Sequence, residues 1–232
     1  MTRFKLYADK DAEVGWLNEM SEKGYAMTGY CAGFYYFEAC IPGEYLYQVD
    51  LTPGMFRVSE DYRQFMLDAG VEIACLWGPW VVLRRRAEEG FFELYTDAES
   101  SIEQYEKIRR MYKRVIALEL GIFALEVIGA AEGSLALGLV FMLMIGAIIV
   151  PMAKELARIN SILTQLYEKA GRQPKGMSAH PGRVSNMLFA GLILNALALC
   201  LQDALGHTVR LLLQLGAVTL MCAGMWRTFR GK

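Results

Sequence analysis

The distribution of apolar residues divides the chain near residue 115. Before this point, apolar and aromatic residues alternate with charged ones, as they do in a globular domain, and after it long apolar runs are separated by short basic stretches. The first run, residues 115–150, is interrupted by Glu119, by Glu126 and by a small polar cluster at 132–134. A membrane-spanning helix needs about 20 apolar residues. The run is therefore too long for one span and predicts two spans that are joined at the polar cluster.

A second pair of spans is predicted over residues 184–201 and 209–226, which gives four spans in total. Lys and Arg cluster before the first span, between the second and third, and after the fourth, and they are rare in the other two connections. Because Lys and Arg are enriched in cytoplasmic loops, we expect both termini in the cytosol. The sequence thus predicts a multi-pass protein of the cell membrane, in contact with the lipid bilayer.

Two apolar stripes at helical spacing extend from the predicted spans. Residues 98–114 predict a cytosolic stalk helix before the first span, and residues 151–183 predict a cytosolic helix and loop after the second. We assign residues 115–232 to a four-span membrane domain that includes this helix and loop.

Residues 1–97 predict a separate cytosolic α+β domain. Helices are predicted over residues 11–23 and 59–68, because Asp9 and Ser59 are favourable N-caps. Apolar patterns bounded by turn residues predict strands over residues 4–8, 25–38, 44–51, 71–77 and 80–86, with a short one at 91–95. Residues 25–38 are rich in aromatics, and Gly29 and Gly33 predict a bend or bulge within them. The order strand–helix–strand–strand–helix–strand is that of the ferredoxin-like (split βαβ) fold, in which two helices cover one face of an antiparallel sheet and the other face is open.

Composition and charge narrow the classes of function. The chain is 54% hydrophobic, above the roughly 45–50% of soluble domains. Its net charge of −1 provides no general attraction to nucleic acid. The five cysteines form no CxxC pair, and His180 and His207 are isolated, so we expect no metal site and reduced thiols. No nucleotide-binding loop or catalytic constellation is present, which predicts a protein without cofactor and without enzymatic activity.

Six segments carry a resemblance to a known family: WLNEMSEKGY (16–25), YYF (35–37), YLYQVD (45–50), AGVEIAC (69–75), PWVVLRRR (79–86) and LYTDAESSIEQYEKI (94–108). Together they resemble a bacterial family of membrane-anchored proteins, the domain of unknown function 2812 (DUF2812), which is common in Firmicutes. Its members look like partners of PadR-type transcriptional regulators, beside which they are often encoded. The resemblance covers about the first 110 residues and implies a regulatory or sensory role, and it brings no active site with it.

The aromatic residues of the first half are candidates for a partner-binding surface, because Trp and Tyr combine a large contact area with a polar tip. The alternative is that most of them pack in the core or in a dimer. The candidate set is Trp16, Tyr25, Tyr36, Tyr47, Trp77 and Trp80. The basic run at residues 84–86 is either a contact for nucleic acid or an acidic partner, or a solvated strand edge, and we favour the edge.

Three polar residues inside the predicted spans are candidates for intramembrane function, namely Glu119, Glu126 and Asn195. The alternative is that they are neutral or paired within the bundle.

The aromatic and the intramembrane candidates lead to two predicted functions. The first is a membrane-anchored regulatory protein whose cytosolic domain binds a protein partner, with a PadR-like regulator as the suggested one. The second is a small transporter or transporter accessory subunit that uses the two glutamates, and four spans would then require a homo-oligomer.

Overall fold

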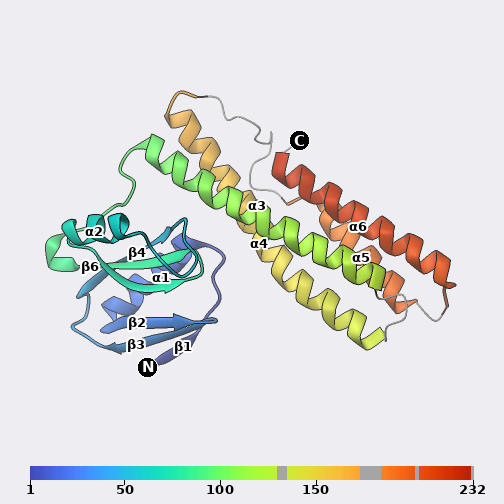
Figure 1. Cartoon of the computed structure of the whole chain (residues 1–232), viewed down its shortest axis with the longest axis horizontal. Helices are drawn as coiled ribbons and strands as arrows, with labels where there is room; N and C mark the ends of the chain where they lie inside the picture. Colours follow the sequence, from blue (N-terminus) through green and yellow to red (C-terminus); the bar gives the residue numbers. More distant parts are fainter. Residues whose placement is uncertain (130–134, 173–183, 202–203, 231–232) are drawn as a thin grey trace. The chain divides into compact units, whose positions relative to one another are not determined.

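The computed structural model describes residues 1–129, 135–172, 184–201 and 204–230. The chain forms two compact units, Met1–Thr96 and Asp97–Lys232 (Figure 1). The boundary lies within one residue of the predicted end of the first domain at residue 97. Each unit is described by itself below.

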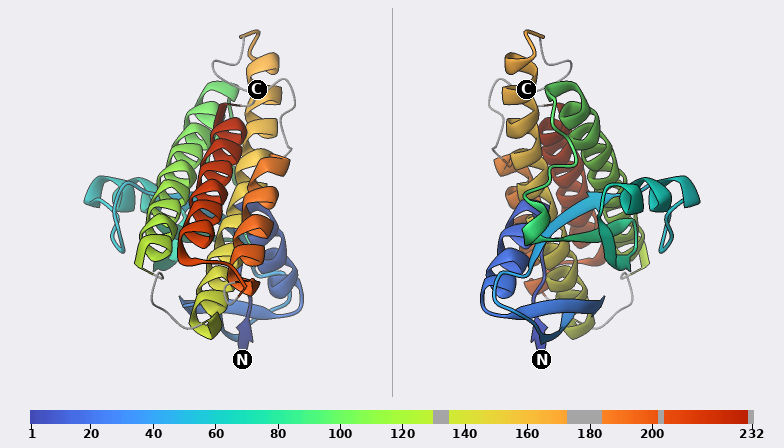
Figure 2. Two further views of the ribbon diagram at one scale, coloured as in Figure 1. Left: turned by 90° about the vertical axis from the view of Figure 1, so that its right-hand side faces the viewer. Right: turned by 90° about the vertical axis from the view of Figure 1, so that its left-hand side faces the viewer.

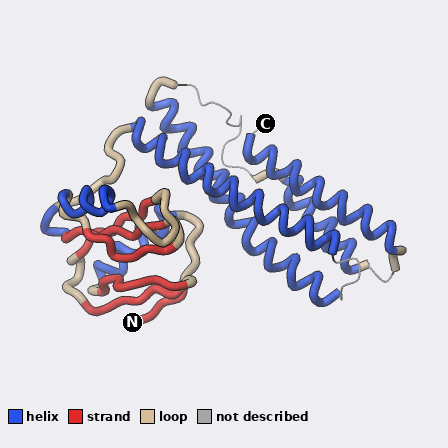
Figure 3. The backbone as a smooth tube through the Cα atoms, viewed as in Figure 1, coloured by secondary structure: helices blue, strands red, loops and turns tan. Residues whose placement is uncertain are grey.

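The first unit contains two three-stranded antiparallel sheets, with strand orders β1-β3-β2 and β4-β6-β5 (Figure 3). Its elements are β1 (Thr2–Phe4), α1 (Lys10–Glu22), β2 (Tyr25–Cys31), β3 (Phe34–Ala39), β4 (Tyr45–Leu51), α2 (Glu60–Asp68), β5 (Glu72–Trp77), β6 (Trp80–Arg86) and the 3-10 turn Ala87–Glu89. The mixed α+β class is confirmed.

The two sheets differ from the single four-stranded sheet that the ferredoxin-like prediction implies. The predicted strand 25–38 is split into β2 and β3 by a two-residue turn at Ala32 and Gly33, both of which have positive φ. Turns of this geometry match the twist of antiparallel strands and favour tight hairpins. The hairpin of β2 and β3 forms a separate sheet together with β1. The predicted strand at 91–95 is not formed, and that segment is irregular.

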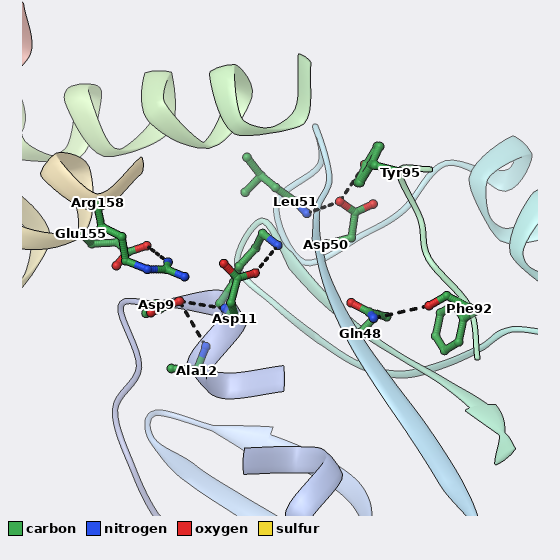
Figure 4. A network of polar contacts seen from close by, with 11 residues as sticks. Asp9, Asp11, Ala12, Gln48, Asp50, Leu51, Phe92, Tyr95, Glu155 and Arg158 are labelled. Carbon is green, nitrogen blue, oxygen red and sulfur yellow. Dashed lines mark hydrogen bonds and ion pairs between the residues drawn. The ribbon is translucent and has the colours of Figure 1, made fainter. Parts of the chain in front are cut away.

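The helices of the first unit begin where the sequence predicts. The Asp9 carboxylate accepts hydrogen bonds from the backbone N–H groups of Asp11 and Ala12 (Figure 4), and the Ser59 hydroxyl accepts one from that of Tyr62. These bonds satisfy backbone donors that a helix start leaves free. Helix α1 ends before Gly24, whose φ of +81° is the left-handed conformation typical of a helix stop.

The β4-β6-β5 sheet is packed on both faces. Side chains from alternate positions of β4 and β6 belong to one cluster that includes α1 and β3: Leu17, Met20, Met27, Tyr35, Phe37, Tyr47, Val49 and Val82. The intervening positions of β6 belong to a second cluster with α2 and the segment after the 3-10 turn: Met66, Val71, Val81, Leu83 and Phe92. Since neighbouring residues of a strand point to opposite faces, neither face of this sheet is open.

Helix α1 also covers the free edge of β4. The Asn18 side chain accepts a hydrogen bond from Tyr47 N at 2.8 Å and donates one to Tyr47 O at 3.4 Å, and the Ser21 hydroxyl accepts one from Tyr45 N. An unpaired strand edge is a template for aggregation. The side chains of Asn18 and Ser21 therefore provide hydrogen-bond partners for backbone groups at this edge of β4.

We expect Asn18→Ala to lower the free energy of unfolding by about 1–3 kcal/mol, because it leaves the backbone groups of Tyr47 without partners in a buried position. Denaturant unfolding followed by tryptophan fluorescence measures the change. The matched control is Glu19→Ala, the adjacent exposed position on the same helix, which should change little. Equal stabilities for the two variants would contradict this role for Asn18.

The second unit consists of the helices α3 (Ala98–Gly129), α4 (Leu135–Lys169), α5 (Asn186–Cys200) and α6 (His207–Arg230) (Figure 2). Helix α3 runs without a break from the predicted stalk into the first predicted span, and α4 runs through Pro151 into the predicted cytosolic helix. The predicted connection at 132–134 lies outside the described residues.

Among the described residues, one helix is long and apolar enough to cross a membrane, His207–Thr228 in α6, and Asn186–Cys200 is a shorter apolar helix. This criterion therefore finds one candidate span where the sequence predicts four. Part of this difference concerns the first residues of α4. Residues 135–152 carry no charged side chain and form the second predicted span, but the side chains of residues 135–139 lie outside the described part of the chain.

Helices α5 and α6 approach each other closely at two glycines. A Cβ atom on Gly191 would lie 2.7 Å from Ala217 O and 2.9 Å from Met221 N. A Cβ atom on Gly224 would lie 2.4 Å from Leu188 N. Small residues that allow such backbone contact are typical of helix pairs in membranes.

Candidate aromatic binding surface

The six predicted aromatic residues divide into a core group and an exposed group. Tyr47 is only 1% exposed, and Trp16, Tyr25 and Trp80 pack against the first core cluster as half-buried side chains. Tyr36 and Trp77 are exposed. Tyr36 and Trp77 are therefore the most exposed of the six predicted residues.

Tyr47 has an internal role that removes it from any surface. Its hydroxyl oxygen accepts a hydrogen bond from Met27 N at 2.8 Å, at the bulge where β2 loses its regular register. The Arg84 guanidinium donates to Met27 O at 3.4 Å. Side chains of the β4-β6-β5 sheet thus satisfy the backbone of the other sheet where its own ladder is interrupted, as buried backbone groups require.

Tyr36 lies on the outer face of the β1-β3-β2 sheet. Its ring lies beside Gly29, its partner on β2, where an added Cβ atom would be 3.8 Å from the ring. Phe4 and Phe34 form a neighbouring pair on the same face, with ring centroids 4.9 Å apart. Cross-strand aromatic pairs and aromatic–glycine contacts stabilise sheets. These contacts account for the exposed aromatics on this face as sheet packing.

Trp77 is part of a second, more prominent group, which we name the Trp77 patch and define as Met55, Phe56 and Trp77. These side chains are 66%, 57% and 38% exposed. The Phe56 and Trp77 rings meet edge to face, with centroids 5.6 Å apart, and Trp77 also contacts Tyr30 at 5.4 Å. The sequence prediction included Trp77 and missed the other two, because loop residues show no periodic pattern that distinguishes exposed from buried positions.

The backbone holds the Trp77 patch rigidly and under strain. Phe56 N donates a hydrogen bond to Gly78 O at 2.6 Å, and Thr52 N donates one to Pro79 O at 2.8 Å, so the loop is tied to the β5–β6 turn. Phe56 has φ = +56°, a conformation that is rare for a residue with a bulky side chain. Such strain costs about 1–3 kcal/mol and clusters at functional sites. Here it directs a large aromatic side chain into solvent.

The basic run at residues 84–86 lies on β6, the central strand of its sheet, so the prediction of a strand edge is wrong. Its three side chains form ion pairs. Arg84 pairs with Glu72 at 2.9 Å, Arg85 with Glu89 at 3.2 Å and Arg86 with Glu88 at 3.5 Å. The first 96 residues contain nine Lys and Arg and fifteen Asp and Glu, a net charge of −6. The three arginines are therefore compensated by neighbouring carboxylates within a unit of negative net charge.

A half-buried carboxylate, that of Glu13, is hydrogen-bonded to the first core. The Tyr35 hydroxyl donates a hydrogen bond to Glu13 Oε1 at 2.6 Å. Burial raises the pKa of the Glu13 carboxyl above its ordinary value of 4.5, and the bond from Tyr35 offsets part of this effect. The folded unit therefore holds this proton to a higher pH than the unfolded chain does. Its free energy of unfolding falls as the pH rises from 4.5 through the folded-state pKa.

We expect Glu13→Gln to remove this contribution, because the amide keeps an acceptor for Tyr35 and carries no charge. The variant should be at least as stable as the wild type at about pH 7 and should lose the pH-dependent decline above about pH 4. Denaturant unfolding across this pH range measures both, with Glu19→Gln on the same helix as the exposed control. An unchanged pH slope in Glu13→Gln would contradict the assignment.

A second carboxylate, that of Asp50, is buried and joins three segments. Its oxygens accept hydrogen bonds from the hydroxyls of Tyr62 at 2.8 Å and Tyr95 at 2.9 Å, and from Leu51 N at 2.8 Å. Figure 4 shows the bonds from Tyr95 and Leu51, and beside them Gln48, which donates to Phe92 O. Burial and the Asp50 charge hold the pKa of the Tyr62 hydroxyl well above its usual range, so it remains a donor. We refer to Asp50, Tyr62 and Tyr95 as the Asp50 clasp.

The intramembrane candidates are only partly within the described structure. Asn195 is buried, and its Oδ1 atom has no hydrogen-bond partner in the described part of the chain. Glu119 is half-buried, and the side chain of Glu126 lies outside the description. Among the described residues, no group of three His, Cys, Asp or Glu side chains is arranged to hold a metal ion.

The fold and these contacts define a mixed α+β unit with a rigid, exposed aromatic patch, followed by a helical unit. Residues 9–117, slightly less than half of the chain, match the model of the family described as "Protein of unknown function (DUF2812)". The comparisons with curated proteins and with solved structures gave no match.

Proposed function

We propose that the protein is a membrane-anchored regulatory protein whose N-terminal unit binds a cytosolic protein partner through the Trp77 patch. The observation that carries the proposal is the positive φ of Phe56 beside the exposed Trp77. Backbone strain and an exposed aromatic pair both oppose folding, so neither is explained by the stability of the unit. Rigid aromatic side chains are the usual anchors of protein interfaces, because little conformational entropy is lost when they bind.

The composition of the second unit supports a multi-pass membrane location. Large apolar side chains are exposed along all four helices: Leu118, Ile122, Val140, Leu143, Met144, Ile148, Phe189, Ile193, Leu197, Leu201, Val209, Leu212, Leu215 and Trp226. A soluble surface rarely exposes so many large apolar side chains, whereas lipid solvates them. Lys and Arg before the first predicted span, after the second and after the fourth orient both termini toward the cytosol.

The electrostatics of the first unit favour a protein as the partner. A net charge of −6 and neutralised arginines disfavour nucleic acid and anionic headgroups. A PadR-like transcriptional regulator is the partner class that the family resemblance suggests. The transporter alternative would use the polar side chains of the helical unit, among which Asn195 and Gln214 are buried on the paired helices α5 and α6.

Affinity purification of the tagged full chain from its native host tests the proposal. One cytosolic protein should be recovered with the wild type and with the control Tyr36→Ser, an exposed aromatic outside the Trp77 patch. Recovery with Trp77→Ala should fall about tenfold or more, the effect of losing a central interface anchor. Equal recovery with Trp77→Ala and with wild type would contradict the assignment.

A further inference from the structure

A second surface of different chemistry lies on helix α2. Met66 is buried in the second core, and the opposite side of the helix carries Asp61, Phe65 and Asp68, spaced four and three residues apart. Residues at this spacing share one face of a helix. Phe65 is 66% exposed on this face, although its burial would stabilise the unit.

The segment after the 3-10 turn packs on the same core cluster as α2. Phe92 is buried in the same cluster as Met66, so this segment packs in the α2 layer. Its neighbours Phe91 and Glu93 are exposed, and Phe91 is 67% exposed. We name the set Asp61, Phe65, Asp68, Phe91 and Glu93 the acidic α2 surface. Phe65 and Phe91 are more exposed than any aromatic side chain of the Trp77 patch.

The carboxylates of this surface are not compensated. In the described part of the chain, Asp61, Asp68 and Glu93 form no ion pair, and Asp68 accepts one hydrogen bond, from Gln64. In contrast, Glu72, Glu88 and Glu89 each form an ion pair with an arginine of the run at residues 84–86. The acidic α2 surface therefore has two exposed phenylalanines and three free negative charges within a unit of net charge −6.

We infer that the acidic α2 surface binds a basic amphipathic segment of another protein, whose apolar side chains cover Phe65 and Phe91 and whose Lys or Arg residues meet the three carboxylates. Charge complementarity of this kind sets specificity and speeds association. The same charges repel anionic lipid, nucleic acid and a second copy of this unit. The inference goes beyond the Trp77 patch and does not rest on it.

Hydrogen–deuterium exchange of the full chain in phosphatidylcholine nanodiscs tests this inference. The probe is a synthetic amphipathic helix of leucine and lysine, about 18 residues long, and the control probe replaces every lysine by glutamate. We expect the basic probe to slow exchange within residues 60–70 and 88–95, with an effect that weakens as salt is added. The acidic probe should leave both segments unchanged.

Two double variants make the result specific. Phe65→Ser with Phe91→Ser should raise the probe concentration for half-maximal protection about tenfold or more. The matched control, Phe4→Ser with Phe34→Ser, removes two exposed aromatics elsewhere and should leave that concentration unchanged. Equal protection in the Phe65/Phe91 variant, equal protection by the acidic probe, or protection confined to the turn at residues 77–80 would overturn the inference. Loss of partner capture in Trp77→Ala is a separate readout that this experiment does not affect.

Discussion

Gly224→Ala is expected to destabilise the second unit by about 3 kcal/mol, the upper part of the range for overpacked sites. The added methyl group would lie 2.4 Å from the backbone nitrogen of Leu188. A backbone atom cannot turn away as a side chain can, so α5 and α6 must separate. The midpoint of thermal unfolding in detergent, followed by circular dichroism, should fall accordingly.

The same substitution at a neighbouring glycine should have the opposite sign. At Gly216 the nearest atom to an added Cβ is Leu194 Cδ2 at 3.8 Å, an ordinary contact. Alanine is favoured over glycine in a helix by about 1 kcal/mol, so Gly216→Ala should be neutral or stabilising. If the two alanine variants unfold at the same temperature, the close approach at Gly224 is not a determinant of helix pairing.

Asp50→Ala is expected to lower the free energy of unfolding of the first unit by about 3–5 kcal/mol, because three donors lose a charged acceptor in a buried position. That is a large part of the 5–15 kcal/mol typical of a domain. Tyr62→Phe and Tyr95→Phe each remove one donor and should cost less, about 1.5–3 kcal/mol. Urea unfolding followed by tryptophan fluorescence gives all three values.

The double variant Tyr62→Phe with Tyr95→Phe tests whether the two tyrosines stabilise the unit through their shared bond to Asp50 or through packing alone. Because both hydroxyls bind the same carboxylate, the two losses should not add. Strict additivity, or an Asp50→Ala variant as stable as either tyrosine variant, would contradict the role assigned to Asp50.

Local signals in the sequence predicted most of the helices and strands of the first unit. Asp9 and Ser59 determine the helix starts by hydrogen bonds to residues two or three positions away. Such contacts are visible in sequence, because capping depends on neighbouring residues. The division of residues 25–38 into two strands was missed, since Ala-Gly is a weak hairpin signal compared with Asn-Gly.

The candidate site depended on contacts that sequence patterns do not contain. Alternation placed Tyr47 on the same strand face as Tyr45 and Val49 but could not say which face is buried. In the structure its hydroxyl accepts a hydrogen bond from Met27 N at the bulge in β2. Asp50 meets Tyr62 and Tyr95, which are 12 and 45 residues away in the chain. Phe56 became a site residue through its backbone conformation and its contact with Trp77, both of which arise only after folding.

Site-specific photo-crosslinking in the native host tests most directly whether the Trp77 patch binds a protein partner. A benzophenone amino acid replaces Phe56 in one variant and Phe4 in a control variant, both at exposed aromatic positions of the first unit. We predict a discrete adduct between the Phe56 variant and one cytosolic protein, which is lost when Trp77→Ala is added and is absent from the Phe4 variant. Adducts of equal yield at both positions, or no protein adduct at position 56, would contradict the account.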